Sequence, residues 1–536
     1  MSDSDNAVPR SPSVSQSHSI SLLSNDASFS DEEMAPEPPL PRVSTLKPLT
    51  LQRVNTARMA DVVRDWIRCF ETDPGSAVID FAEVLAFSVG SQRRPDENYY
   101  TLEGRCAFLN DLRDEFTDDM KLPVEIDSES VNDIDMLTNM RCFATVLTAA
   151  SLPRIFLDEN FEFYVYATLF DMAGFTKAHA CRRLAVGMLI KVNTVLLKYI
   201  LDHRDGDEIP ELQNSAKAIY SAVIHKGFKD HVEFIRLHIL QEIRTWLRNG
   251  SFVVKIEVLL DSLLPLMKCD SCPAIRFEAF KVFKLIVERM QPPLPPSVVS
   301  IFDNVRDFVK FAVFDDDEKI CVISLEICTH LFFLAPEIFA VEDHNLYMLQ
   351  ILNTEHPEVV KAAAQFFLAT FPADIESTAE KIRFFVGYFT EGSVLTGFNP
   401  KTMVDAFYPE FEPLTDFDGL LDIVVKANRH DKGPPIHILR LLRFIAKVES
   451  AKEDHTIYHK LRDAVYANCS ALIHKHSGNA LWDKALWNLF FNFEWQIDED
   501  DDMLVEEHQA FVAYGLRLTH NGFFRVPEQR TPTPDI

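Results

Sequence analysis

The sequence predicts an all-α protein built from repeated helical hairpins, and three observations favour this class. From about residue 56 to residue 518, apolar residues recur at steps of three and four, which is the period of an amphipathic helix. Short breakers such as Asn249-Gly250 and Gly433-Pro434-Pro435 separate helix-length segments. Glycine contributes only 16 of 536 residues, which disfavours β-rich folds with many tight turns.

The spacing of these segments indicates a repeat architecture. Roughly twenty helices would form about ten hairpins of some 40–47 residues each, which is the length of a HEAT or armadillo unit. Each hairpin in such an array packs only on its neighbours. We therefore predict a HEAT/armadillo-like helical-repeat solenoid, and the alternative is a non-repeating all-α domain.

The two ends of the chain differ in composition from the rest. Residues 1–55 are rich in Ser and Pro, so we expect a disordered tail that cannot bury enough apolar surface to offset its ordering entropy. Residues 521–536 have the same character. Four Ser and Thr residues in these tails precede proline or acidic residues and are candidates for phosphorylation: Ser11, Ser30, Thr531 and Thr533.

One segment illustrates the helical pattern between the tails. Val232, Ile235, Ile239, Ile243 and Trp246 step by three and four and should share a buried face. The charged residues of the same segment fall largely outside that stripe: Glu233, Arg236, Glu242, Arg244 and Arg248. In a later segment, Pro357 suits the first turn of a helix.

No motif for catalysis occurs in the sequence, so we expect no enzyme, no cofactor and no small-molecule substrate. Cys269 and Cys272 form a CxxC pair without the second pair that a zinc site needs, and reduced thiols are expected. The acidic run 498–502 matches no calcium-loop spacing. Residues 315–318 are acidic too, and we expect them to cap the helix that follows.

No membrane association is expected either. The N-terminus is polar and lacks the apolar stretch of a signal peptide. The longest apolar candidate, Leu331 to Val341, is interrupted by Pro336 and Glu337, and it is too short to span a bilayer.

The formal net charge of −28 implies that contact with DNA would need a local basic patch. Basic residues do cluster on neighbouring predicted helices, although such faces often only contact water. The DNA-contact candidates are Lys226, Lys229, Arg236, Arg244, Arg248, Arg182 and Arg183. Of these, Arg236, Arg244 and Arg248 fall within about a third of the circumference of one helix.

An ordered series of segments over about residues 60–425 resembles the cohesin stromal-antigen (stromalin) family. Asp65-Trp66-Ile67 resembles the core of the family's first helices, and the stretch 140–200, with FTKAHACRRLAVGMLIKVNTVLL, is similar to its stromal-antigen domain. Residues 228–316 resemble its stromalin conservative domain. Two further segments follow in the family's order: AVEDHNLYMLQILNTEHPEVVKAAAQFF and KIRFFVGYFTEGSVLTGF.

The resemblance implies how the ordered region divides. We expect N-terminal stromal-antigen-like repeats over 56–225, stromalin-conservative-like repeats over 226–316 and C-terminal repeats over 317–520. It also implies a non-enzymatic scaffold in the nucleus that binds the kleisin subunit, the cohesin ring with its SMC ATPases, and chromatin, in sister-chromatid cohesion and chromosome segregation. The family usually continues for several hundred residues more. A generic HEAT-repeat adaptor without a chromosomal role is the alternative, and mitotic and meiotic use both stay open.

The resemblance further implies a pocket for aromatic peptides, in which two of three anchors are missing here. Phe228 falls at the position of the family's Tyr. The anchoring Trp falls at Pro265 or Leu266, and the family's Arg falls at Asn304. Docking of Phe-x-Phe peptides is therefore expected to be weak.

Overall fold

A computed structural model gives the structure of the chain. It describes residues 46, 58–116, 131–250, 255–336, 339, 347, 350, 354–391, 399–428, 430, 433–493 and 502–520. Two compact units divide the chain at Ser44/Thr45, and every described residue lies in the second unit. The described residues form helices and turns and no β-strand, which confirms the predicted all-α class.

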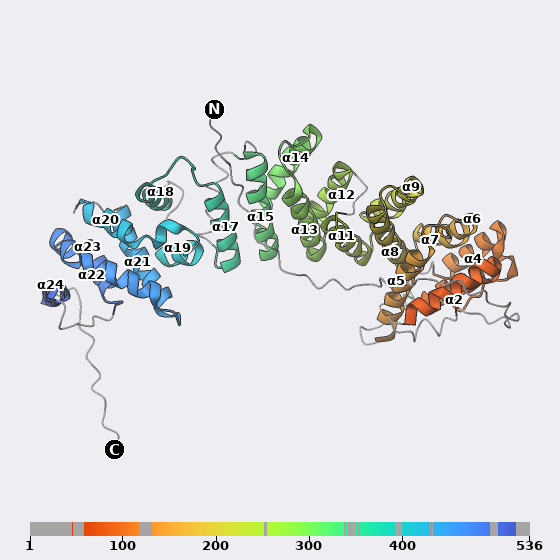
Figure 1. Ribbon diagram of the computed structural model, residues 1–536, viewed down its shortest axis with the longest axis horizontal. Helices are drawn as coiled ribbons and strands as arrows, with labels where there is room; N and C mark the ends of the chain where they lie inside the picture. Colours follow the sequence, from red (N-terminus) through yellow and green to blue (C-terminus); the bar gives the residue numbers. More distant parts are fainter. Residues whose placement is uncertain are drawn as a thin grey trace, which may run out of the picture. The chain divides into compact units, whose positions relative to one another are not determined.

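A first layer of helices runs through the described part of the chain, and each of its helices packs on the next in the series. Figure 1 shows several of them side by side, such as α11, α13, α15 and α17. The first layer comprises α2 (Met59–Thr72), α5 (Val131–Ser151), α8 (His179–Asp202), α11 (Glu233–Arg248), α13 (Pro273–Arg289), α15 (Glu318–Leu334), α17 (Pro357–Ala369), α19 (Pro400–Phe407), α21 (Pro434–Ser450) and α23 (Ala480–Phe490).

A second layer packs against the first from the middle of the chain onward. Its members are α12 (Ile256–Cys269), α14 (Pro296–Ala312), α18 (Thr378–Glu391), α20 (Phe417–Lys426), α22 (Thr456–His476) and α24 (Asp502–His520). Within this layer α12 packs on α14, and α18, α20, α22 and α24 pack in succession. Successive hairpins thus contact their neighbours, and the predicted helical-repeat solenoid is confirmed.

The remaining helices belong to the N-terminal part. They are α3 (Pro74–Ser88), α4 (Leu102–Glu115), α6 (Glu159–Phe161), α7 (Ala167–Ala173), α9 (Ile209–Ile219) and α10 (His225–Gly227), with short 3-10 or π turns beside them. Local signals set their bounds. Pro74 occupies the first turn of α3, where its missing N–H costs nothing, and the Asp73 side chain accepts a hydrogen bond from the Ser76 N–H.

Aromatic side chains fill much of the core in the described part of the chain, and many of them are phenylalanines. Trp66 of α2 stacks on Phe70 and meets Phe143 of α5 edge-on. Farther along, Phe367 of α17 contacts the rings of Phe385 and Phe407. Rings of this size remove large apolar areas from water, so they hold adjacent hairpins together.

A ladder of arginines and aspartates links the hairpins along one edge of the first layer. Arg182 of α8 contacts Asp230 at 2.8 Å, and Arg236 of α11 contacts Asp270 at 2.7 Å. Arg276 of α13 continues the series with Asp315 at 3.6 Å. Each arginine therefore joins its own helix to the turn that precedes the next first-layer helix.

The aspartates of this ladder also shape their turns. Asp230, Asp270 and Asp315 each accept a hydrogen bond from the N–H two residues later. Such Asx turns lead the chain into the following helix. The acidic stretch 315–318 acts as predicted at the start of α15, because the Asp317 side chain caps the Lys319 N–H at 3.0 Å.

The long helix α8 revises the prediction about apolar segments. By length and composition alone this helix could cross a membrane, because an 18-residue window of it has a mean hydropathy of 1.7. Of that window, 67% is buried inside the protein. Its neighbours α5, α7, α9 and α11 cover it. Arg182 and Lys191 interrupt the apolar run of α8, so the sequence pattern indicates 331–341, and not α8, as the longest apolar candidate for a membrane span.

Leu46 departs from the expectation for the N-terminal tail. It lies inside the segment 1–55, yet its side chain is only 1% exposed and belongs to the hydrophobic core. The other residues of both predicted tails lie outside the described residues, and so do Ser11, Ser30, Thr531 and Thr533.

Candidate binding groove on the first helix layer

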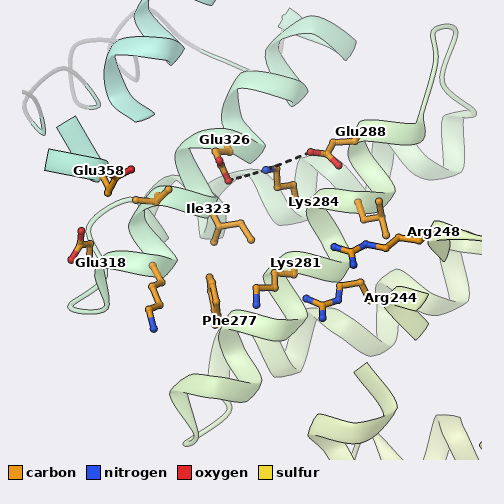
Figure 2. A pocket seen from close by; sticks show the side chains of 13 residues that line it. Arg244, Arg248, Phe277, Lys281, Lys284, Glu288, Glu318, Ile323, Glu326 and Glu358 are labelled. Carbon is orange, nitrogen blue, oxygen red and sulfur yellow. Dashed lines mark hydrogen bonds and ion pairs between the residues drawn. The ribbon is translucent and has the colours of Figure 1, made fainter. Parts of the chain in front are cut away.

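A groove of about 690 Å³ crosses the first layer over α11, α13 and α15 and reaches the start of α17 (Figure 2). Its floor carries apolar side chains because these helices turn part of their apolar face toward it. The lining residues are Arg244, Arg248, Phe277, Lys281, Lys284, Leu285, Glu288, Glu318, Lys319, Val322, Ile323, Glu326 and Glu358.

The charges of the groove are unevenly placed. Figure 2 shows Arg244 and Arg248 toward one end and Glu318 and Glu358 toward the other. The first pair comes from α11, whereas Glu318 opens α15 and Glu358 lies in the first turn of α17. Two arginines thus lie toward one end of the groove, on the same side as Glu288, and two glutamates lie toward the other.

Ion pairs between neighbouring helices hold the walls of the groove. Arg244 contacts Glu278 of α13 at 2.9 Å. Lys284 of α13 contacts Glu326 of α15 at 2.9 Å and Glu288 at 3.5 Å. The side chains of Arg244, Lys284 and Glu326 are each between 23% and 34% exposed, so water screens these pairs only in part. These residues stabilise the layer as well as lining the groove.

Two cations of the groove are less engaged than Lys281. The Lys281 ammonium lies 4.1 Å from the centre of the Phe277 ring, and it also contacts Glu278 at 3.3 Å. Arg248 and Lys319 have no ion pair with any described residue. Their charges are available to an external group, and the apolar floor beside them suits an extended peptide segment.

The lining of the groove consists of charged and apolar side chains. It contains no Cys, Ser or His, and the described part of the chain holds no group of three or more metal-ligating side chains. Cys269 and Cys272 are free thiols at the end of α12 and in the following turn, where the Cys272 N–H donates to Asp270.

A second hollow lies at the ladder edge, beside the turn before α15. It measures about 730 Å³ and is mainly acidic. Its lining residues are Pro273, Arg276, Phe314, Asp315, Asp316, Asp317, Glu318 and His356. Asp315 and Asp317 already serve the turn and the helix cap, so they have a structural role there.

The seven DNA-contact candidates separate into three groups. Arg182 and Arg236 are buried in the ladder, at 5% and 8% exposed, so they do not stand on an outer face as the periodicity suggested. Arg183 and Arg244 are half-buried. Lys226, Lys229 and Arg248 are exposed, and only these three of the seven present their charges openly to solvent.

The reason for the buried arginines is packing between repeats. Helical periodicity marks which residues face the core of one hairpin, but Arg236 faces the next hairpin, where Asp270 compensates its charge. Glu242 is buried for the same reason, because Lys191 and Thr194 of α8 contact it. DNA contact by the exposed candidates stays a prediction.

The three positions of the predicted aromatic-peptide pocket lie on successive hairpins. Phe228 follows α10, Leu266 lies on α12, and residue 304 lies on α14. Phe228 is 2% exposed and Leu266 is 6% exposed, whereas Pro265 faces solvent. The side chain of Asn304 lies outside the described residues. Phe228 therefore belongs to the core and forms no open aromatic wall.

Several groove residues were not predicted from the sequence, namely Phe277, Lys281, Lys284 and Lys319. Each occupies an ordinary position on a helix face, and only the packing of α11, α13 and α15 brings them together. The ladder could have been recognised in the sequence from a repeated spacing. Asp230 and Arg236 are six residues apart, and so are Asp270 and Arg276.

Comparison with solved structures identifies a similar fold. The cohesin subunit Scc3 from Z. rouxii (residues 88–1035) matches with a TM-score of 0.64 at 14% sequence identity, over 89% of this chain and 63% of that one. This chain thus spans less than two thirds of that protein. An engineered protein also aligns, with a TM-score of 0.31 and 13% identity over 84% of this chain and 99% of its own.

Comparisons of sequence add no family assignment. No protein-family model matches the chain, and no curated protein matches it. The similarity to Scc3 therefore shows the fold, an Scc3-like helical-repeat architecture over most of the chain.

Proposed function

We propose that the chain is a non-enzymatic scaffold subunit of cohesin, of the stromal-antigen type, which binds the kleisin subunit and chromatin. One observation carries the proposal: the Scc3-like fold covers 89% of the chain. The ordered series of family-like segments over residues 60–425 supports it independently of the fold.

The groove gives this scaffold a surface for a peptide-like partner. Repeat proteins bind extended segments along the surface of stacked helices. The apolar floor would contact the side chains of such a segment, while Arg248 and Lys319 would pair with its acidic residues. A kleisin segment laid along the first layer would meet this groove between α11 and α17.

Affinity purification tests the proposal. The full-length chain, tagged at its endogenous locus, would be purified from dividing cells and its partners quantified by mass spectrometry. We expect kleisin and the SMC ATPase subunits in amounts comparable to the bait. Recovery of the intact chain with other partners and neither of these would favour the generic adaptor.

A further inference from the structure

A compact group of cations on α5, α8 and α11 lacks matching anions among the described residues. Arg141 comes from α5 and Arg183 from α8, and both guanidinium groups lie against the ring of Phe234 on α11. Their central carbons are 5.2 and 3.8 Å from the ring centre. Two positive charges therefore share one aromatic ring, which is an unfavourable arrangement unless an anion lies near.

The local sequence makes room for this arrangement. Arg183, Gly187 and Lys191 follow one another at intervals of four on α8, so they share a face. A Cβ atom at Gly187 would lie 3.0 Å from Nε of Arg141, so the missing side chain lets this guanidinium rest against α8. On α11, the side chains of Phe234 and His238 are likewise four residues apart and stack.

Hydrogen-bond donors of the group are left unused. Nε and Nη2 of Arg141 and Nε of Arg183 are buried without a partner in the described part of the chain. His238 is 8% exposed, and its Nε2 is unpartnered as well. Buried polar atoms normally have a partner in the protein, an ordered water or a bound ion, so several unpaired ones in one place leave donors for a bound group.

The carboxylate that acts on Arg141 is already engaged. Glu242 accepts hydrogen bonds from Lys191 and from Thr194, and among the described residues it forms no ion pair with either arginine. Burial, together with the positive charge of Arg183, lowers the pKa of Arg141, which agrees with an uncompensated pair. Two guanidinium charges consequently remain for an external group.

We propose that Arg141, Arg183 and His238 form a binding site for a phosphorylated serine or threonine in a segment of a partner protein. The two guanidinium charges match a phosphate dianion, and their N–H groups suit its oxygens. A single carboxylate would leave one charge unmatched. Duplex DNA is disfavoured because both arginines are half-buried and the chain carries a net charge of −28.

Fluorescence anisotropy on the full-length chain tests this site. The probe is a labelled pool of degenerate peptides with a fixed phosphoserine, and the comparisons are the same pool with serine, the same pool with glutamate, and a labelled DNA duplex. We expect the phosphoserine pool to bind at least tenfold more tightly than either other peptide pool. The double variant R141Q/R183Q should abolish that difference and leave DNA retention unchanged.

The matched control is the double variant R154Q/R204Q, which removes the same charge from exposed positions and should bind like the unmodified chain. If R141Q/R183Q does not fold, hydrogen exchange on the unmodified chain decides, with protection by the phosphoserine pool expected on α5, α8 and the first half of α11. Equal binding of the three peptide pools, unchanged binding by a folded R141Q/R183Q, protection elsewhere, or loss of DNA retention in this variant would overturn the proposal.

Discussion

The guanidinium group of Arg236 donates hydrogen bonds to both carboxylate oxygens of Asp270, at 2.7 and 2.9 Å, across the boundary between two hairpins. A third N–H of the same group donates to the backbone carbonyl of Asp230. The two charged side chains are 10% and 4% exposed, so neither charge has ready access to water. This pair fixes the register between α11 and α13.

The first prediction concerns that pair. Arg236→Gln leaves Asp270 as a buried charge without its counter-ion, and breaking a buried pair in this way costs about 3–5 kcal/mol. We expect a loss of this size in the free energy of local opening at α11 and α13, measured by native-state hydrogen exchange. Arg64→Gln is the control, because its pair with Asp61 is exposed; an equal effect of both variants would contradict the structural role.

The second prediction concerns pH. Burial, and then the positive charges of Arg141, Lys191 and Arg183, lower the pKa of His238 from 6.5 to about 3. The unfolded chain takes up this proton below pH 6.5 and the folded chain does not, so stability is fully present above pH 6.5 and falls as the pH drops toward 3. The slope contributed is about 1.4 kcal/mol per pH unit.

Thermal unfolding at pH 7 and pH 5 measures this effect. His238→Gln should reduce the loss of stability between the two values, because glutamine takes up no proton. The matched control is His474→Gln, which replaces an exposed histidine of α22. Identical pH profiles for the unmodified chain and H238Q would show that His238 does not carry the effect.

The third prediction concerns aromatic peptides. Phe228 and Leu266 are buried, so these positions offer no open aromatic slot. The two anchors that the sequence lacks, at Pro265 or Leu266 and at Asn304, are each worth roughly 2 kcal/mol. We expect Phe-x-Phe peptides to bind at least a hundredfold more weakly than they bind family members that have both anchors. Calorimetry decides, and a micromolar or tighter affinity at these positions would refute the prediction.

The fourth prediction concerns DNA. Among the candidates, Lys226, Lys229 and Arg248 are exposed, so replacing all three by Glu should lower DNA retention and flatten its salt dependence. The slope should fall by about 0.9 for each phosphate that the chain no longer binds. The triple replacement of Lys401, Lys460 and Lys484 by Glu changes the charge equally at other exposed positions. If both triple variants retain DNA equally well, the patch has no specific role.

The sequence predicted the fold better than the site. The period of three and four marks Ile235, Ile239, Ile243 and Trp246 correctly as core, because burial within one hairpin follows directly from helix geometry. Pro357 likewise lies in the first turn of α17, as its fixed backbone angle favours.

Contacts between hairpins could not be predicted in this way. Arg236 and Glu242 have the polarity of surface residues, yet both are buried, because their partners come from other parts of the chain, 34 and 51 residues away. The groove has the same origin, since Phe277, Lys281 and Lys319 line one hollow with Arg248 only when α11, α13 and α15 stack. Residue patterns within one helix carry no information about such distant pairs.

Direct binding of kleisin is the most decisive measurement for the proposed function. Purified full-length chain would be titrated by calorimetry with recombinant kleisin from the same organism, with hydrogen exchange on the complex to locate the contact. We predict saturable one-to-one binding, with protection at the groove between α11 and α17 and on helices between Asp374 and Val526. Protection confined to the N-terminal half would show that kleisin binds there and not at the predicted helices. An absence of binding by the folded chain would contradict the proposal that it is a cohesin subunit.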